Sequence, residues 1–182
     1  EMGEGREALF AVTIPEKPGS FLDFCRIIGN RNITEFNYRM SSRDEAHAFA
    51  GISIADSDEI QQLQQSMQDA GLATLNLHDN ELGKLHIRHM VGGHCPLVEN
   101  EVLYRFEFPE RPGALLEFLS RAGGRWNISL FHYRNHAAAY GRVLAGVEVP
   151  PHERADFEHY LGGLGYPFVN ESENEAYTLF LK

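Results

Sequence analysis

The chain has 182 residues, of which 43% are hydrophobic and 23% charged, and this composition is typical of a globular protein with room for two domains of about 90 residues. Its formal net charge of −10 argues against a nucleic-acid-binding surface, because such surfaces cluster Lys and Arg against phosphates. No apolar run approaches the ~20 residues of a membrane-spanning helix, so neither a nucleic acid nor a membrane is an expected partner.

The cysteines and the first residues indicate a cellular compartment. Cys25 and Cys95 are too few for a disulfide framework, and they lack the spacing of a C-x-x-C metal site. Residues 1–6 have no signal-peptide character. We therefore expect a protein of the reducing cytoplasm.

The first expected element is a strand at residues 7–14. Apolar and polar side chains alternate there, and this alternation predicts a half-buried strand. A Pro-Gly turn follows at 18–19. Beyond it, apolar residues at helical spacing predict an amphipathic helix that ends at Gly29. The residues expected to face inward are Phe21, Phe24, Cys25 and Ile28.

The rest of the first half is predicted to hold strands at 33–39 and 47–55 and then a second helix. Asp56 and Glu59 are spaced as a capping box at the start of that helix. An extended segment that ends in a strand at 84–88 completes this half. The inward residues of the second helix are predicted to be Ile60, Leu63, Met67 and Ala70.

The second half repeats the first. The segment IPEKPGSFLDF at 14–24 returns as FPERPGALLEF at 108–118, and each copy continues into Asn-Ile-x-x-Phe-x-Tyr-Arg. The offset is 94 residues in the first motif and 95 in the second, and 13 positions between Ile14 and Arg39 are identical, where composition predicts about one or two. A period this long indicates a duplicated small domain, because each half must supply its own core.

The same elements are therefore expected again. Alternation predicts a strand over 102–108, further strands over 128–134 and 142–149, and a last extended segment ending at 177–181. The first helix of this half has Leu115, Phe118, Leu119 and Ala122 inward. Pro150 or Pro151 opens the second, with Phe157, Tyr160, Leu161 and Leu164 inward.

Each half thus follows a β-α-β-β-α-β plan, with room for one extra short strand. We predict an α+β fold of two tandem ferredoxin-like subdomains, with antiparallel sheets and helices packed on one face. The boundaries are an N-terminal extension at 1–6, a first subdomain at 7–89, a linker at 90–100 and a second subdomain at 101–182. The linker is short and marked by Gly and Pro, which favours packed halves over a flexible tether.

The Pro-Gly turns are candidate ligand sites. A glycine before a helix leaves backbone N–H groups open to a ligand, and such a helix start suits a carboxylate or a phosphate. A tight turn without a ligand is the alternative, and the duplication makes the two interpretations about equal. The candidate residues are Gly19, Ser20 and Phe21 in the first copy and Gly113, Ala114 and Leu115 in the second.

A Tyr-Arg pair closes the next strand in each copy, as Tyr38-Arg39 and Tyr133-Arg134. The tyrosine shares a face with a phenylalanine two residues earlier, and the arginine points the opposite way. The tyrosine could contact an effector beside the Pro-Gly turn, and the arginine could bind a carboxylate or bridge subunits. The alternative is an aromatic residue packed on the sheet beside a solvated arginine.

Other chemistries have weaker signals. His86 and His89 would lie on opposite faces of a strand, without a carboxylate at metal-ligand spacing. We interpret the polar runs at 79–81 and 174–175 as solvated turns before the last strands. The glycine clusters lack the strand-loop-helix context of phosphate loops, and there is no G-x-S-x-G motif. On the residues alone, a small-molecule-binding or assembly module is favoured over an enzyme.

The motifs at 15–21, 32–39, 85–93 and 108–115 resemble the C-terminal regulatory region of biosynthetic threonine dehydratase (threonine ammonia-lyase), and the similarity covers 7–182. The resemblance implies tandem ACT-like domains that bind isoleucine, a feedback inhibitor, and valine, which opposes it. It also implies a parent lyase that converts threonine to 2-oxobutanoate and ammonia. The expected assembly is a homo-oligomer, a dimer of this fragment within a tetramer of the parent enzyme.

The resemblance also implies residue roles. It places effector-site tyrosines at Tyr38 and Tyr133, arginines tied to feedback sensitivity at Arg88 and Arg134, and apolar contacts around Leu115. The family's pyridoxal-phosphate lysine and glycine-rich phosphate loop have no counterpart in this sequence. We therefore expect no cofactor and no catalysis in this chain, and the catalytic domain of the same enzyme as its partner. The alternative is an assembly module that pairs subunits without binding a ligand.

Overall fold

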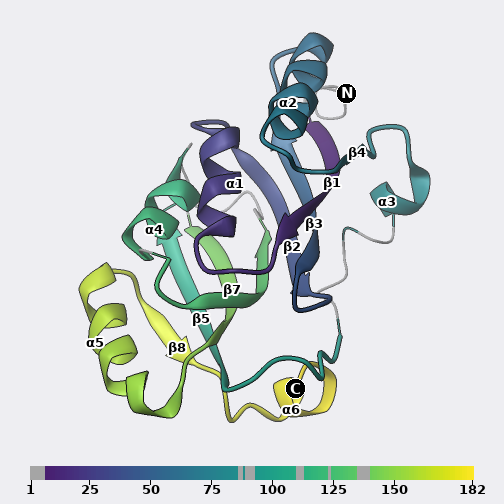
Figure 1. The fold of residues 1–182 in the computed structure, drawn as a ribbon. Coiled ribbons are helices and arrows are strands. Elements are labelled where there is room, and N and C mark those ends of the chain that lie inside the picture. Colours follow the sequence, from purple (N-terminus) through teal and green to yellow (C-terminus); the bar gives the residue numbers. More distant parts are fainter. Residues whose placement is uncertain (1–6, 86–87, 89–92, 110–112, 123, 135–139) are drawn as a thin grey trace.

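The computed structural model describes residues 7–85, 88, 93–109, 113–122, 124–134 and 140–182 (Figure 1). The first half contains β1 (Glu7–Pro15), α1 (Ser20–Ile28), β2 (Ile33–Met40), β3 (Glu45–Ser53), α2 (Ser57–Asp69), β4 (Thr74–Asn76) and α3 (Glu81–Leu85). The second half contains β5 (Glu101–Pro109), α4 (Ala114–Ala122), β6 (Asn127–Arg134), β7 (Tyr140–Glu148), the 3-10 turn η2 (Pro151–Glu153), α5 (Arg154–Leu164), β8 (Phe168–Asn170) and α6 (Glu175–Phe180).

All eight described strands belong to one antiparallel sheet, in the order β4-β1-β3-β2-β6-β7-β5-β8. The order β4-β1-β3-β2 is that of one ferredoxin-like unit, and the other half mirrors it. The two units join where β2 pairs with β6, with Tyr38 opposite Phe131 and Phe36 opposite Tyr133. This register relates the halves by an approximate two-fold axis through the middle of the sheet. The predicted α+β class is confirmed.

One face of the sheet carries the main helices, with α1 and α4 side by side at the centre and α2 and α5 toward the ends (Figure 1). The core beneath them is continuous across both halves. Phe21 of α1 lies 4.6 Å, ring centre to ring centre, from Phe36 of its own half and 4.7 Å from Phe131 of the other half. Because aromatic rings bury large areas, these contacts make the interior of each half depend on the other.

The predicted helical faces are largely as the structure has them, but Ala70, which was expected to face inward, is exposed at the C-cap of α2. The buried residues of α1 include Phe24, Cys25 and Ile28, as expected from their spacing. The predicted N-cap of α2 is also confirmed, because Asp56 accepts from the backbone N–H of Glu59 at 3.1 Å. The other half of the predicted capping box differs, because the Glu59 carboxylate accepts from the backbone N–H of Ala55, one residue before the N-cap, at 2.7 Å.

The strands predicted at 84–88 and 177–181 are wrong. Their described parts lie mostly in the short helices α3 and α6, and the final strand of each half is instead the earlier β4 or β8. The cause is helix capping: Asn80 Oδ1 accepts from Gly83 N at 2.9 Å, and Asn174 Oδ1 accepts from Ala176 N at 2.9 Å. The polar runs interpreted as solvated turns before strands are helix starts.

The second face of the sheet carries a buried ion pair that links the halves. Arg39 Nη1 of β2 donates to Glu101 Oε2 of β5 at 2.6 Å, and the two side chains are only 10% and 5% exposed. Tyr177 of α6 donates to the other carboxylate oxygen at 2.7 Å, and Ser129 of β6 also donates to Glu101. A Cβ on Gly146 would lie 3.0 Å from both Glu101 Oε2 and Leu130 Cβ, so a glycine at this position leaves room for the two side chains.

Arg39→Met should lower the free energy of unfolding by about 3 to 5 kcal/mol, because it leaves the Glu101 carboxylate buried without its cation. Arg43→Met is the matched control, since Arg43 and its partner Glu99 are 64% and 69% exposed. Its loss should stay below about 1 kcal/mol. Urea unfolding of both variants measures the difference, and equal losses would refute a structural role for the buried pair.

Candidate functional site

A cavity of about 60 Å³ lies where the Pro-Gly turn of the first half meets the core of the second half. The first half contributes the predicted residues Gly19, Ser20, Phe21 and Tyr38. The structure therefore brings together the turn and the tyrosine that the sequence paired. The second half contributes residues from α4, β6, β7, α5 and the loop before β6, among them Phe118, Leu119, Gly124, Trp126, Asn127, Ile128, Phe131, Ala145, Val147, Phe157, Tyr160, Leu161 and Leu164.

A second cavity of about 10 Å³ lies at the symmetry-related position. It brings together the other predicted group, which consists of Gly113, Ala114, Leu115 and Tyr133. Its remaining walls include residues of the first half, on α1, in the loop that follows it and at the start of β2: Cys25, Gly29, Arg31, Asn32 and Ile33. Each cavity is thus composite, because one half supplies the turn and the tyrosine while the other supplies the loop after its first helix.

The backbone conformation of the two turns favours glycine. Gly19 and Gly113 have φ angles of +88° and +77°, which side-chain-bearing residues rarely adopt. A Cβ on Gly124 would lie 3.2 Å from Gly19 Cα, and a Cβ on Gly113 would lie 3.2 Å from the Asn30 side-chain oxygen. The first turn therefore approaches Gly124 closely and the second approaches Asn30, although a Cβ on Gly19 itself would meet no atom within 4 Å.

Trp126 distinguishes the first cavity from the second. It is the additional residue that changes the repeat offset, since Arg125 and Asn127 align with the adjacent residues Arg31 and Asn32. Trp126 Nε1 donates to Glu153 at 2.6 Å, and its ring centre lies 5.0 Å from that of Phe157 on α5. The first cavity accordingly extends to α5, whereas the second has space for about one water.

Two buried hydroxyls line the first cavity. The Oγ of Ser20 and the Oη of Tyr160 are fully buried and have no hydrogen-bond partner among the described residues. Gly19, the N-cap of α1, supplies no side-chain hydrogen bond, and the first N–H groups of a helix lack intrahelical acceptors. Because an unpaired buried polar group is costly, this lining favours a polar ligand group at the start of α1.

An acidic group, Glu16, lies behind two residues that line the same cavity, Tyr38 and Asn127. Tyr38 Oη donates to the Glu16 carboxylate and lies 2.9 Å from the Ile128 carbonyl oxygen. Glu16 also accepts from Asn127 Nδ2 at 2.7 Å. Burial raises the pKa of Glu16, although these hydrogen bonds act against the shift, and burial likewise raises the pKa of Tyr38. Glu16 was not among the predicted site residues. The repeat has the same residue type, Glu110, at the equivalent position, and this identity could have marked Glu16 as a candidate.

A family model described as the C-terminal regulatory domain of threonine dehydratase matches residues 1–87 and 93–181. The chain belongs to this family. It is 54% identical to the biosynthetic L-threonine dehydratase IlvA of Burkholderia multivorans, with 100% of the chain and 36% of the relative covered. The chain is 50% identical to the E. coli K12 enzyme of the same name, with 100% of the chain and 35% of that relative covered. It is 43% identical to the mitochondrial threonine dehydratase of Saccharomyces cerevisiae, with 100% of the chain and 33% of that relative covered. The chain spans about a third of these relatives' length.

Two of the three arginines predicted at the effector site, Arg39 and Arg88, lie away from the cavities. Arg39 faces away from Tyr38, on the second face of the sheet. Arg88 lies on that face too, where its Nε donates to Glu35 Oε2 at 2.9 Å. The structure therefore does not bring Arg39 or Arg88 to either cavity. The side chain of Arg134 lies outside the described residues, and its backbone pairs with Glu35 of β2.

Among the described residues of the regulatory domain, no three His, Cys, Asp or Glu side chains gather closely enough to hold a metal ion. Of the two histidines considered as ligands, His86 and His89, both lie outside the described residues. None of the described helices is long and apolar enough to cross a membrane.

Glu16→Gln should leave the ligand-free domain at least as stable as the wild type at pH 7. The raised pKa means that folding disfavours the ionised carboxylate, so wild-type Glu16 reduces stability as pH rises through its titration. The advantage of the glutamine variant should shrink as pH falls and vanish near pH 3, below the ordinary glutamate pKa of about 4.3, where the carboxyl is protonated in both states. Unfolding at pH 3 and 7 measures this, with the exposed Glu158→Gln as the charge control. An advantage that grows toward acid pH would contradict the assignment.

Proposed function

We propose that this chain is the effector-sensing part of a biosynthetic threonine ammonia-lyase, binding isoleucine as a feedback inhibitor and valine as its antagonist. The observation that carries the proposal is the pair of composite cavities, each built from a Pro-Gly helix start and a tyrosine. Membership of the regulatory family supports a sensing role. The two cavities add candidate places for the amino acids.

In the first cavity, the effector's carboxylate lies at the start of α1, where Ser20 Oγ and backbone N–H groups offer hydrogen bonds. Its branched side chain contacts Phe21 and enters the apolar interior beside Phe131 and Val147. Tyr38 lines the cavity between the place of the carboxylate and the place of the branched side chain. The 60 Å³ cavity must widen to admit a whole amino acid, which gives binding a route to shift the packing of the two halves.

Two unequal cavities suit two opposed effectors. Isoleucine and valine differ by one methylene, which a pocket senses by only about 1 to 3 kcal/mol. Opposite effects therefore require different sites or different states of the protein. A coupling free energy of ~1 to 3 kcal/mol between these cavities and a catalytic site would change affinity there by about 5- to 150-fold.

The conversion of threonine to 2-oxobutanoate and ammonia belongs, in this proposal, to the preceding part of the enzyme, which binds pyridoxal phosphate. The residues of this chain do not fit that cofactor. Lys17 and Lys84 are exposed, in a turn and in α3, and Lys182 is the last residue. None follows a glycine-rich loop that could hold a phosphate. We also place the enzyme in the cytoplasm as a homo-oligomer, a tetramer in which the regulatory parts pair.

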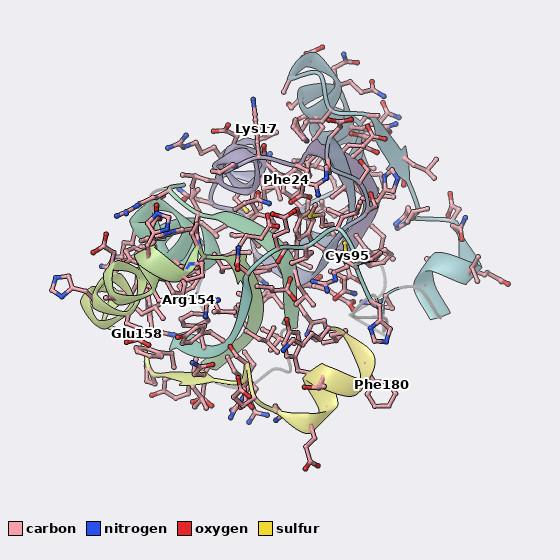
Figure 2. All side chains as sticks on the ribbon, turned by 60° about the horizontal axis from the view of Figure 1, so that its bottom comes forward. Lys17, Phe24, Cys95, Arg154, Glu158 and Phe180 are labelled. Atoms are coloured by element: carbon pink, nitrogen blue, oxygen red, sulfur yellow. The ribbon has the colours of Figure 1, made fainter. Side chains whose placement is uncertain are left out.

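An assembly module is the second candidate, favoured by a separate observation. A groove of about 440 Å³ runs beside α6, lined by Leu103, Leu144 and Phe180. Phe180 is 65% exposed, and Figure 2 shows it on the outer side of α6. A module that only pairs subunits would associate with rising concentration, and amino acids would leave its stability unchanged.

Isoleucine at ~100 times its dissociation constant should stabilise the wild-type chain by about 2.7 kcal/mol and raise its unfolding midpoint by about 5 to 10 °C. D-isoleucine, the stereochemical control, should have no such effect. Thermal unfolding with isoleucine, valine and D-isoleucine measures these shifts. No stereospecific shift at millimolar ligand would favour the assembly module.

Tyr38→Leu and Tyr133→Leu, made separately, should each weaken binding in the cavity that the tyrosine lines. The expected result is a smaller shift with isoleucine or valine for at least one variant, since leucine removes both the aromatic ring and the hydroxyl from the cavity lining. Tyr140→Leu, at an exposed tyrosine on β7, is the control and should retain both shifts. If neither cavity variant altered either shift, the site assignment would be wrong.

A further inference from the structure

One tyrosine hydrogen has two acceptors beside the first cavity. Tyr38 Oη donates to the Glu16 carboxylate, and it also lies 2.9 Å from the carbonyl oxygen of Ile128. A tyrosine hydroxyl carries a single hydrogen, so it cannot donate fully to both oxygens at once. Glu16 belongs to the same half as Tyr38, whereas Ile128 belongs to the other half. The direction of this hydrogen therefore decides whether the hydroxyl links the two halves.

The protonation state of Glu16 determines that direction. An ionised carboxylate only accepts, so the hydrogen of Tyr38 points to it. A protonated carboxyl can donate its own O–H to Tyr38 Oη, and the tyrosine hydrogen then bonds the Ile128 carbonyl. Asn127 Nδ2, which donates to Glu16 Oε1 at 2.7 Å, is satisfied in both states. The protonated state thus completes a chain of hydrogen bonds from Glu16 through Tyr38 to Ile128.

The charged groups around Glu16 come from several elements. Burial raises the pKa of Glu16, the two side-chain hydrogen bonds that it accepts lower it, and the Glu148 carboxylate on β7 raises it. Arg39 on β2 lowers this pKa, although its guanidinium pairs on the second face of the sheet. Lys17 and Asp44 are exposed neighbours, and in the described part of the chain no ion pair holds Glu16 in its ionised form. Glu16 can therefore change its charge without breaking a salt bridge.

We propose that Glu16 is a positioning residue of the first cavity, whose charge selects between the two hydrogen-bond partners of Tyr38. This inference rests on the proposed function. The ionised carboxylate holds the Tyr38 hydroxyl within the first half and leaves Ile128 untied. The protonated carboxyl ties Tyr38 to Ile128. Because these two residues line the cavity and come from different halves, the tie opposes the widening that an amino acid requires.

Effector binding and the ionisation of Glu16 are therefore linked. A ligand that needs the wider cavity favours the ionised carboxylate, since only that state leaves Ile128 without the tyrosine bond. Binding then lowers the pKa of Glu16 and releases a proton, and by reciprocity the affinity for the effector rises as pH rises through the titration of Glu16. The inference concerns the first cavity, because Glu110, the equivalent of Glu16, lies outside the described residues.

Glu16→Gln imitates the protonated form. Its side-chain N–H can donate to Tyr38 Oη, and its carbonyl oxygen can accept from Asn127, so Tyr38 bonds Ile128 at every pH. The variant should bind isoleucine about 3- to 10-fold more weakly than the wild type at pH 7.5, which is the effect of one net hydrogen bond. The wild-type affinity should fall toward that of the variant at pH 4.5, whereas the variant should change by less than about 2-fold.

Tyr38→Phe removes the hydrogen that Glu16 directs. In this background Glu16→Gln should change the isoleucine affinity by less than about 2-fold, because no tie to Ile128 can form. Calorimetric titration of the 182-residue chain with isoleucine measures the wild type, both single variants and the double variant at the two pH values. Glu158→Gln, at an exposed glutamate on the outer side of α5 (Figure 2), removes one negative charge elsewhere and should bind like the wild type.

The outcomes separate this inference from the function on which it rests. Isoleucine binding by Glu16→Gln at wild-type strength at pH 7.5 would overturn the inference alone. An effect of Glu16→Gln that persisted undiminished beside Tyr38→Phe would do the same. If Glu16→Gln failed to fold, the wild type and Tyr38→Phe would still decide, because only the wild type should lose affinity at pH 4.5. If the wild type bound no isoleucine, both the inference and the proposed function would fall.

Discussion

The antiparallel pairing of β2 with β6 is the constraint on which the rest of the structure depends. It places Tyr38 opposite Phe131 and Phe36 opposite Tyr133, and so fixes how the two repeats face each other. Once this register is set, Phe21 packs on Phe131, and each Pro-Gly turn meets the loop of the other half. The cavities are a consequence of that meeting, since neither repeat alone carries all the walls of either one.

Most elements could be predicted from the sequence because their signals are local. Alternation identified the long strands, the spacing of Phe21, Phe24 and Ile28 identified α1, and Asp56 with Glu59 identified the start of α2. The segments near α3 and α6 failed because Asn80 and Asn174 cap helices there, while the same residue type is also typical of turns. The β2–β6 pairing was beyond local reasoning, because the pattern of a strand does not identify its partner at an edge.

The candidate site, too, could be predicted from the sequence only in part. Repetition of the Pro-Gly and Tyr-Arg motifs was enough to pair Tyr38 with Gly19, and period-two geometry separated Tyr38 from Arg39. Glu16 and Asn127 were missed because their contact joins residues 111 positions apart, in different repeats. The shapes of the two cavities also depend on one additional residue, Trp126, whose effect is visible only when α5 is in place.

The joining of two repeats in one chain also changes how the sites respond to dilution. Two separate copies that met through the same strand edges would dissociate at low concentration, and both cavities would disappear with them. A covalent linker keeps the partner at an effective concentration that for short linkers reaches the millimolar range. The composite cavities therefore persist at nanomolar protein. The sensing geometry is set by the covalent chain and not by how much of the protein is present.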